Sequence, residues 1–471
     1  MLKNHIINIL TEQLGHRPTE SQQKMIDLLP GFLSGTNSKE IFLVKGFAGT
    51  GKTSILGALV RTMHIFKNNV VLLAPTGRAA KVLASYCGYP ASTIHKKIYR
   101  QRSSADGTGS FVMDRNMHKD TLFIVDEASM ISNQPSESDI FGSGRLLDDL
   151  IGYIDNGKNC RLVLVGDTAQ LPPVGIDISP ALEAGYLRGF GYAVTEVFLS
   201  EILRQAEDSG ILFNATGIRH EIESGGNSIP RIVTGGFNDI ERISGSDLIE
   251  KITDSYGNRG IEETIVVTRS NKRANQFNKG IRDSILFRDE ELAAGDLLMV
   301  VRNNYFWMPE NEITDFIANG DIIEVIRVRR YEEMYGFRFA DALVRFVDYK
   351  DTEIEVKLML DTITSETAAL TQEQGRKLFQ SVAGDYSAVT NKRKRFEQMR
   401  ENRWFNALQV KFAYSVTCHK AQGGQWKNVF VDQGYITDEM INTEYLRWLY
   451  TAFTRPTTRL FLVNFSDRFF D

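Results

Sequence analysis

Residues Glu40 to Leu56 read EIFLVKGFAGTGKTSIL, and this stretch decides the fold. The apolar run Ile41 to Val44 predicts a buried strand, the glycines that follow predict a turn, and the residues after Lys52 predict a helix. A glycine-rich turn between a strand and a helix is a P-loop, in which backbone N–H groups surround phosphate oxygens at the positive end of the helix dipole. The sequence therefore predicts a nucleotide-binding α/β domain.

The P-loop gives each of its polar positions an expected role. Lys52 is expected to reach the β- and γ-phosphates, and the Thr53 hydroxyl is expected to bind Mg²⁺. The residues expected to surround the phosphates are Gly46, Ala48, Gly49, Thr50, Gly51, Lys52 and Thr53. Kinases, GTPases, motor ATPases and helicases share this motif, so only the rest of the chain can distinguish them.

Length and composition limit the class of protein. A chain of 471 residues exceeds one hydrophobic core and suggests about three domains. It has no apolar run of the roughly 18 residues that a membrane span needs, and its polar N-terminus is unlike a signal peptide, so we expect a cytoplasmic protein. The net charge of −4 neither indicates nor excludes nucleic-acid binding. The three cysteines lack metal-ligand spacing and are expected to be reduced thiols.

The first part of the chain predicts a doubly wound parallel sheet. Two helices are expected before residue 40, the second with Thr19 as N-cap and Gln22 closing a capping box. The apolar runs at 69–74, 121–125 and 161–165 predict strands that alternate with helices and end in polar residues. We expect a helix to carry residues 91–95, and a hairpin with an apolar tip, around Phe111 and Val112, to occupy the polar stretch 100–119.

The second part predicts another α/β domain with a β-rich insert. A second alternating set is expected to begin at Glu196 and to include a strand at 264–268. Between 295 and 363 the hydrophobic period changes to two, which predicts antiparallel strands in a small barrel-like insert. A helical stretch is expected to begin at Thr371 and to end in the basic block Lys392–Arg395. The expected domains are 1–198, then 199–292 with 406–471, and the insert 293–405.

Three further motifs carry candidate catalytic residues. Asp126 and Glu127 follow a strand, so Asp126 is expected to hold Mg²⁺ through water and Glu127 to activate the attacking water, although such a pair also occurs as a helix N-cap. Gln170 can sense the γ-phosphate or the water, unless its Gly-Asp-x-x-Gln context is a simple proline turn. Arg204 and Arg455 follow apolar helical segments, and an arginine delivered to the transferring phosphate contributes about 10³–10⁵ in rate.

Taken in order, the motifs of this chain resemble those of superfamily 1 DNA helicases, in the branch of the RecD and phage Dda proteins. They are GFAGTGKT, APTGRAAKVL, STIH, IVDEASM, VGDTAQLPPVG, LSEILRQ, YSVTCHKAQGGQW and LYTAFTR. The resemblance implies two RecA-like parallel-sheet domains that bind ATP and Mg²⁺ between them, with an SH3-like insert in the second and a hairpin in the first. It further implies a monomer that moves 5′ to 3′ along single-stranded DNA and unwinds tailed or forked duplexes, in repair or recombination.

The resemblance also assigns residues. Gln22 matches a glutamine that reads adenine, although the capping box explains it equally and Gln23 is a neighbouring candidate. The positions that match DNA-facing motifs are Pro75, Thr76, Arg78, Thr93, His95, Thr417, His419 and Lys420. For Thr93 and His95 helix capping is the alternative. Gln425 stands where many relatives have an acidic residue, which puts ribose selectivity in doubt.

Aromatic residues are candidates for base stacking and strand separation. The stretch around Phe111 is the expected separation pin, and Phe306, Trp307 and Trp404 are candidate stacking platforms, with burial in a core as the alternative for each. The block 392–395 either binds phosphates or merely solvates a helix. Two other functions stay open: an RNA or ribonucleoprotein-remodelling helicase, and a nucleotide-switched, non-motor subunit of a nuclease complex.

Overall fold

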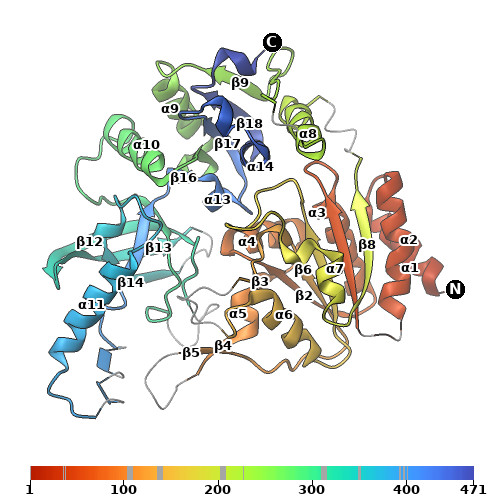
Figure 1. Ribbon diagram of the computed structural model, residues 1–471, viewed down its shortest axis with the longest axis horizontal. Helices are drawn as coiled ribbons and strands as arrows, with labels where there is room; N and C mark the ends of the chain where they lie inside the picture. The colour runs from red at the N-terminus through yellow and green to blue at the C-terminus, as the bar shows by residue number, and fades with distance from the viewer. Residues whose placement is uncertain are drawn as a thin grey trace.

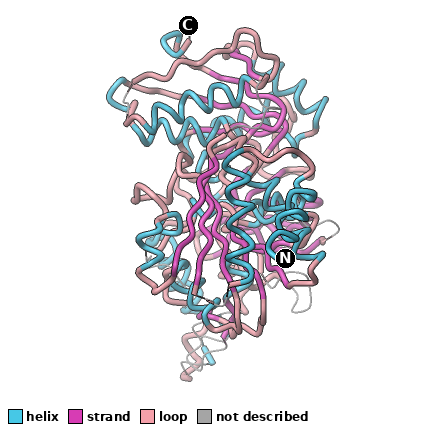
Figure 2. Tube along the Cα trace, turned by 90° about the vertical axis from the view of Figure 1, so that its right-hand side faces the viewer, coloured by secondary structure: helices cyan, strands magenta, loops and turns pink. Residues whose placement is uncertain are grey.

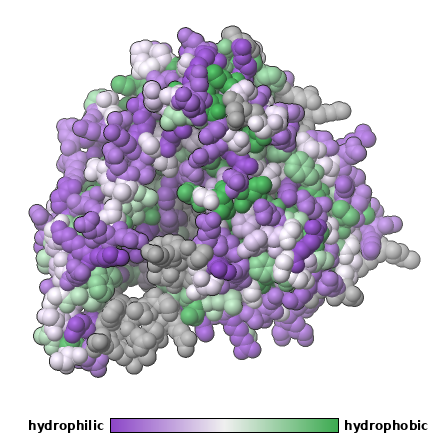
Figure 3. Space-filling view, in the orientation of Figure 1, coloured by the Kyte–Doolittle hydropathy of each residue, from purple (hydrophilic) through white to green (hydrophobic). Residues whose placement is uncertain are grey.

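Two parallel sheets and a closed barrel make up the computed structural model (Figure 1). It describes residues 2–35, 37, 39–102, 110–134, 142–201, 208–225, 228–308, 316–347, 352–391, 394–395, 398–399 and 401–470. Among these residues no helix is long and apolar enough to cross a membrane, and the face shown in Figure 3 is mostly hydrophilic.

The first sheet has the strand order β3-β2-β6-β7-β1-β8, and all neighbours are parallel. Its strands are β1 (Glu40–Gly46), β2 (Asn69–Ala74), β3 (Ala91–Thr93), β6 (Thr121–Val125), β7 (Arg161–Gly166) and β8 (Ala193–Leu199). Its helices are α1 (Leu2–Leu14), α2 (Glu20–Ser34), α3 (Lys52–Ile65), α4 (Gly77–Cys87), α5 (Ile94–Ile98), α6 (Leu146–Asp155) and α7 (Ala184–Arg188). This order confirms the predicted doubly wound sheet.

The continuous apolar runs of the central strands pack on both faces of this sheet. In β1, Ile41 and Leu43 belong to the core under α5 and α6, whereas Phe42 and Val44 belong to the core under α1, α2 and α3. Figure 2 shows the strands between helices on either side. Because both faces are covered, these strands are apolar throughout, as is typical of parallel sheets.

Two expectations for the first domain were wrong. Residues 91–93 form the edge strand β3, beside Leu72 to Ala74 of β2, and the helix begins only at Ile94. Glu196 lies in β8, which pairs with β1 and so belongs to the first sheet rather than opening the second. Both strands lie at edges of the sheet, where residues are partly exposed and the apolar pattern is weak.

The second sheet has the order β16-β10-β17-β18-β9 and is also parallel. Its strands are β9 (Ile240–Ile243), β10 (Thr264–Thr268), β16 (Ser415–Thr417), β17 (Trp426–Asp432) and β18 (Pro456–Val463). Its helices are α8 (Gly210–Glu223), α9 (Leu248–Arg259), α10 (Asn271–Ser284), α13 (Cys418–Ala421) and α14 (Thr443–Phe453). Two parallel α/β domains confirm the predicted fold class.

The insert is a closed five-stranded barrel. Its strands are β11 (Leu297–Val300), β12 (Ile322–Met334), β13 (Phe337–Phe346), β14 (Glu353–Met359) and β15 (Leu408–Phe412). The closing strand β15 was expected in the second α/β domain, but it pairs antiparallel with β11 and parallel with β14. Its residues are buried throughout because they fill the gap between those two strands.

The helix between the barrel strands β14 and β15, α11 (Gln372–Asp385), begins where it was expected, and Thr371 and Gln374 form a capping box there. It ends at Asp385 and does not continue into the basic block, of which Lys394 and Arg395 are described and Lys392 and Arg393 lie outside the described residues. Short 3-10 turns occur at Ala128–Met130, Pro180–Leu182, Ile261–Glu263, Leu360–Thr362, Asp438–Met440 and Asp467–Phe469.

The polar stretch 100–119 contains the expected hairpin, formed by β4 (Tyr99–Arg102) and β5 (Ser110–Met113). Its tip, residues 103–109, lies outside the described residues. Phe111 is not at a tip but in a core, with 6% of its surface exposed. Its ring centroid lies 3.9 Å from that of Tyr305, which precedes the barrel strand β12. This corrects the expectation of an apolar tip, because the packed aromatic pair holds Phe111 inside.

Candidate active site

The P-loop has the predicted strand–turn–helix context. β1 ends at Gly46, and α3 begins at Lys52 with Gly51 as its N-cap in the left-handed conformation at φ 78°. A Cβ on Gly46 would lie 2.9 Å from the Cβ of Leu199 and 3.0 Å from the Thr50 hydroxyl, so a larger residue would push the loop off β8. The glycine turn therefore brings the backbone N–H groups of the first turn of α3 to the position where phosphates bind in a P-loop.

Lys52 lies across its own loop. Its Nζ donates hydrogen bonds to the carbonyl oxygens of Gly46 at 2.9 Å and Phe47 at 2.8 Å. The same ammonium lies 3.8 Å from Oδ2 of Asp167, a fully buried carboxylate at the end of β7. Asp167 was missed by the sequence analysis, although it stands in the Gly-Asp-x-x-Gln motif that identified Gln170.

The Asp-Glu pair follows β6, as predicted. The Glu127 N–H donates to Oδ1 of Asp126 at 2.9 Å, and Glu127 has the left-handed φ of 54°, which is uncommon outside glycine. Its side chain makes no capping hydrogen bond to the 3-10 turn that it precedes, so the N-cap alternative does not explain it. Burial, with the adjacent charge of Glu127 added, raises the pKa of Asp126, and Lys52 opposes this rise.

Mg²⁺ fits the oxygen donors of this site. The Thr53 hydroxyl, half-buried in the first turn of α3, and the Asp126 carboxylate are the hard oxygen ligands that Mg²⁺ prefers. A divalent cation would also relieve the charge repulsion that raises the pKa of Asp126. Among the described residues no group of three or more His, Cys, Asp or Glu side chains could hold a metal. Mg²⁺ is commonly held by one or two protein oxygens together with substrate phosphates, which suits Thr53 and Asp126.

Gln170 has a buried side chain whose amide oxygen has no hydrogen-bond partner among the described residues. The residue is 6% exposed. A buried acceptor left without a donor costs about 1–3 kcal/mol, so this oxygen favours a ligand with an O–H group. A water molecule attacking a phosphate has such a group, which agrees with the predicted sensing role.

Gln22 forms the capping box and also contacts the P-loop. Its Oε1 accepts from the Thr19 N–H at 3.1 Å, and its Nε2 donates to the Thr50 carbonyl at 3.0 Å. Because the fully buried amide already has partners at both ends, reading adenine would require one of them to leave. Gln23, the neighbouring candidate, lines an open hollow of about 640 Å³ with Arg17 and Thr19.

The second domain meets the P-loop through α14. The Ala48 N–H donates to the Tyr450 hydroxyl at 2.8 Å, and the Leu171 N–H donates to the Thr451 hydroxyl at 2.8 Å. The guanidinium of Arg219, on α8, lies 4.4 Å from the centroid of the Phe47 ring. Neither Tyr450 nor Arg219 was a predicted site residue, because nothing local in the sequence places either one beside the P-loop.

Arg455 points into its own domain. Its Nε donates to the Thr451 carbonyl at 3.0 Å, and its two terminal nitrogens donate to the Gly424 carbonyl at 3.2 Å and the Thr454 hydroxyl at 3.0 Å. In this arrangement its nitrogens donate within the second domain. Among the described residues the expected contact with the phosphate site is not formed. Arg204, the other predicted arginine, lies outside the described residues.

In the first domain, the predicted DNA-facing residues follow β2 and β3. Pro75 precedes Thr76, which caps α4 by accepting the Ala79 N–H at 3.2 Å. The guanidinium of Arg78 donates to the Gln425 carbonyl at 3.1 Å and lies 4.1 Å from the Trp426 ring, so it joins the two domains. The Gln425 side chain accepts from the Tyr86 hydroxyl at 3.0 Å, which directs its amide to α4.

Thr93 adopts its structural alternative, helix capping. The Thr93 hydroxyl caps α5 by accepting the Lys96 N–H at 3.1 Å, and the residue is 3% exposed. Burial lowers the pKa of His95 to about 4, so its imidazole is neutral at pH 7 and supplies no positive charge to a phosphate.

In the second domain, Thr417 and Lys420 line a narrow crevice between α10 and the barrel, together with Lys411. The Lys420 ammonium donates to the Asn319 side chain at 2.7 Å. Burial lowers the pKa of Lys411 and of Lys420 to about 8 each, and the charge of Lys420 contributes to the shift of Lys411. His419 is exposed beside them. An anion would stabilise the charged form of both lysines.

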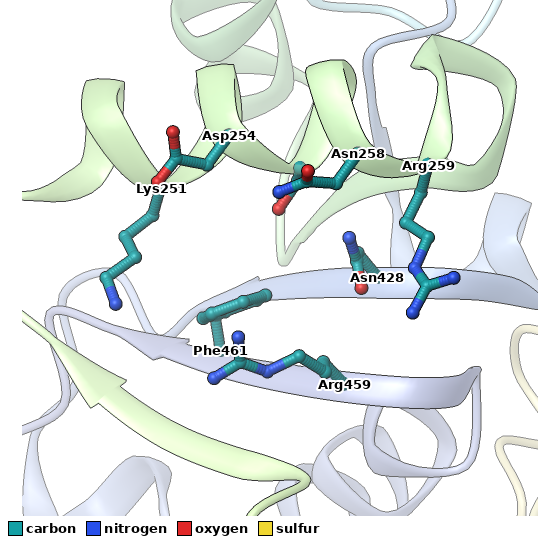
Figure 4. Close-up of a pocket in the computed structure, with 8 residues that line it drawn as sticks. Lys251, Asp254, Asn258, Arg259, Asn428, Arg459 and Phe461 are labelled. Carbon is teal, nitrogen blue, oxygen red and sulfur yellow. The ribbon is translucent and has the colours of Figure 1, made fainter.

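A separate hollow of about 420 Å³ lies between α9 and the strands β17 and β18 (Figure 4). Lys251 and Arg259 reach into it from the helix, and Asn428 and Arg459 reach into it from the strands. Glu241 pairs with both Lys251 at 2.6 Å and Arg459 at 2.8 Å, and so offsets part of the positive charge around the hollow. No predicted site residue lines this hollow.

Comparisons with known proteins find similarities in both domains. Residues 31–223 match the family described as AAA domain, and residues 412–463 match the UvrD-like helicase C-terminal domain. The chain is 25% identical to the uncharacterized protein R530 of Acanthamoeba polyphaga mimivirus, over 90% of this chain and 95% of that one. Among solved structures, a Pif1 helicase at forked double-stranded DNA is 16% identical, with a TM-score of 0.49, over 96% of this chain and 94% of that one.

Two named relatives are DNA helicases. The chain is 23% identical to the ATP-dependent RecD2 DNA helicase of Deinococcus radiodurans over 94% of its own length, and spans 48% of that protein. It is also 23% identical to the ATP-dependent DNA helicase dda of Enterobacteria phage T4, over 65% of this chain and 67% of that one. The chain thus spans about half of the RecD2 relative.

The P-loop, the Asp-Glu pair and the two parallel sheets define a two-domain P-loop NTPase. The similarities in both domains confirm, within that class, the resemblance to the RecD/Dda-like branch of superfamily 1B.

Proposed function

We propose that this chain is an ATP-dependent DNA helicase that moves 5′ to 3′ along single-stranded DNA and unwinds tailed or forked duplexes. The observation that carries the proposal is the direct hydrogen bonding of α14, in the second domain, to the P-loop and to the loop after β7 of the first. A ligand that enters the P-loop changes that contact and therefore changes how the domains lie together. The relatives named as DNA helicases support DNA as the polymer.

Each residue of the phosphate site has its own proposed role in ATP hydrolysis. Lys52 leaves the carbonyl oxygens of its own loop to bind the β- and γ-phosphates of ATP. Thr53 and Asp126 would hold Mg²⁺, which neutralises charge on the phosphates. Glu127 accepts a proton from the attacking water, and the unpartnered oxygen of Gln170 orients that water. Arg204 and Arg455 are the arginines proposed to stabilise the transition state.

The crevice lined by Thr417, Lys411 and Lys420 is the proposed second-domain contact with the DNA backbone. In the first domain the proposed contacts are Pro75, Thr76 and Arg78. Two lysines with lowered pKa values favour an anionic ligand, which supports a phosphodiester backbone here. A monomer that works in the cytoplasm, in DNA repair or recombination, completes the proposal.

A strand-displacement assay tests activity and polarity together. Duplexes with a 5′ single-stranded tail should be unwound with ATP and Mg²⁺, whereas duplexes with a 3′ tail should not. Lys52→Ala should abolish both unwinding and ATP hydrolysis, because the ammonium that binds the phosphates is lost. The matched control is Lys45→Ala, which removes an ion pair with Glu196 on the neighbouring strand and should retain activity.

The outcomes separate the alternatives. Hydrolysis stimulated by single-stranded RNA but not by DNA would identify a remodeller of RNA. Hydrolysis without unwinding of any tailed duplex would favour a nucleotide-switched subunit of a larger complex. Either result would overturn the helicase proposal.

A further inference from the structure

The hydroxyl of Tyr450 is buried between the two domains. The residue is 1% exposed, in the middle of α14. Its oxygen accepts the Ala48 N–H at 2.8 Å, and its hydrogen is donated to Oδ2 of Asp167 at 2.7 Å. A phenol has one hydrogen to donate, so that hydrogen is committed to Asp167. Burial, with the charge of Asp167 added, raises the pKa of Tyr450 and keeps the hydroxyl protonated.

Both partners of this hydroxyl belong to the phosphate site. Ala48 is a residue of the P-loop, and its N–H carries one hydrogen. A phosphate oxygen that accepted this hydrogen would therefore compete with the Tyr450 oxygen for the same donor. Asp167 lies 3.8 Å from the Lys52 ammonium through the same oxygen that accepts the tyrosine hydrogen. The hydroxyl thus connects the second domain to the main charged group of the P-loop.

Helix α14 carries this connection further. Thr451, next to Tyr450, accepts the Leu171 N–H through its hydroxyl, in the loop after β7 that also contains Asp167 and Gln170. The carbonyl oxygen of Thr451 in turn accepts from Nε of Arg455. A change at Tyr450 therefore reaches Arg455 through one turn of helix.

We propose that Tyr450 is a positioning residue whose hydroxyl competes with nucleotide phosphates for the Ala48 N–H, so that nucleotide binding releases α14 from the P-loop. The inference rests on the proposed function only in that the P-loop binds ATP and ADP. It adds a specific trigger to the cycle: the phosphate displaces a phenol, and the helix that carries Arg455 becomes free to move.

The competition predicts an uncommon direction of change. Tyr450→Phe keeps the ring in its place and removes the oxygen, so the arrangement that competes with the nucleotide loses the hydrogen bond from the Ala48 N–H. One net hydrogen bond is worth about 1 kcal/mol, which corresponds to about a fivefold gain in ADP affinity. Slower release of the tightly held product should lower turnover, so affinity rises while kcat falls.

The control lies on the same helix. The Tyr445 hydroxyl is also buried, but it accepts from Nε2 of Gln433 at 3.3 Å within the second domain. Binding of ADP with Mg²⁺ is measured by isothermal titration calorimetry, without nucleic acid, for the wild-type chain, Tyr450→Phe and Tyr445→Phe. Thermal melting of each protein is recorded beside it. We expect about fivefold tighter binding for Tyr450→Phe alone.

The result can fail in two distinguishable ways. If the wild-type chain binds ADP and Tyr450→Phe binds it equally or more weakly, the competition does not exist and Tyr450 only packs the interface. If the wild-type chain does not bind ADP, the proposed function itself is overturned. A steady-state comparison completes the test, because a purely structural role would lower both affinity and kcat.

Discussion

Arg455 lies at the end of the helix that carries Tyr450, and three second-domain groups hold its guanidinium. The residue is 3% exposed, so it cannot reach a phosphate by a simple rotation of its side chain. Release of the guanidinium toward a phosphate has to break these hydrogen bonds, each worth about 1 kcal/mol net. Contact with a phosphate must return at least as much free energy for Arg455 to act there.

Arg455→Ala should therefore affect turnover far more than nucleotide affinity. Loss of the guanidinium should lower kcat by about 10³ or more, because it acts on charge that develops during phosphoryl transfer. ADP affinity should change little, since in the described arrangement the arginine donates within its own domain. Phosphate release and calorimetric ADP binding provide the two measurements. Arg455→Lys tests the fork of the guanidinium, and normal hydrolysis in the alanine variant would remove Arg455 from the site.

The three cysteines are buried and free. Burial raises the pKa of Cys87 to about 11 and that of Cys418 to about 12. The thiolate is the reactive form, and below these raised pKa values little of it is present. At pH 8 the native protein should react with a disulfide reagent such as DTNB much more slowly than the protein in urea. Rapid reaction of all three thiols in the native state would contradict the described burial.

The sequence identifies the parts of the site that are local in the chain. Lys52, Thr53, Asp126 and Glu127 follow strands that short apolar runs reveal, so their context is predictable without tertiary structure. Tyr450 is different because its partner Ala48 is 402 positions away. Only the packing of α14 against the P-loop brings the two together, and no spacing rule contains that contact.

At the scale of elements, edge strands are the least predictable parts. In β8 the side chain of Glu196 pairs with Lys45 of β1 at 2.8 Å, so a charged residue occupies a strand whose central neighbours are apolar. β3 has only three residues, too few for a repeating pattern to be recognised. By contrast, the central strands β2 and β6 have the predicted bounds, because burial on both faces makes them continuously apolar.

The hairpin of β4 and β5 supports a prediction about unwinding. Replacing residues 103–109 with a two-residue Asn-Gly turn keeps both strands and the contact between Phe111 and Tyr305. If the tip separates the strands, this protein should lose duplex unwinding while DNA-stimulated ATP hydrolysis stays near the wild-type rate. Both activities are measured on the same 5′-tailed duplex.

The matched control alters the packed part of the hairpin. Phe111→Ala should lower thermal stability, since a buried aromatic ring truncated to alanine costs about 3–5 kcal/mol. If the shortened hairpin loses ATP hydrolysis together with unwinding, the tip has a structural role and is not a separation pin.

At the scale of the whole molecule, one buried carboxylate joins the second domain to the barrel. Asp296 accepts hydrogen bonds from Arg282 of α10, from Arg288 and from the Tyr414 hydroxyl, and it is fully buried. Arg282 belongs to the second domain, whereas Tyr414 closely follows the barrel strand β15. The carboxylate thereby binds two guanidinium groups from a position that is itself closed to solvent.

Asp296→Ala should destabilise this half of the molecule strongly. Removing one partner of a buried ion pair leaves an uncompensated charge and costs about 3–5 kcal/mol. Calorimetric melting should show a lower transition temperature for the second domain and barrel, with the first-domain transition unchanged. The exposed Asp289 provides the control, because Asp289→Ala should leave both transitions in place. An unaltered melt of Asp296→Ala would contradict the described network.

The position of β15 has a consequence for synthesis on the ribosome. The barrel closes only when residues 408–412 emerge, and β9 pairs with β18, which ends at residue 463. The first sheet, in contrast, is complete once β8 has emerged at residue 199. The nascent chain therefore carries a finished nucleotide-binding domain followed by some two hundred residues that wait for their closing strands, a long window in which chaperones can act.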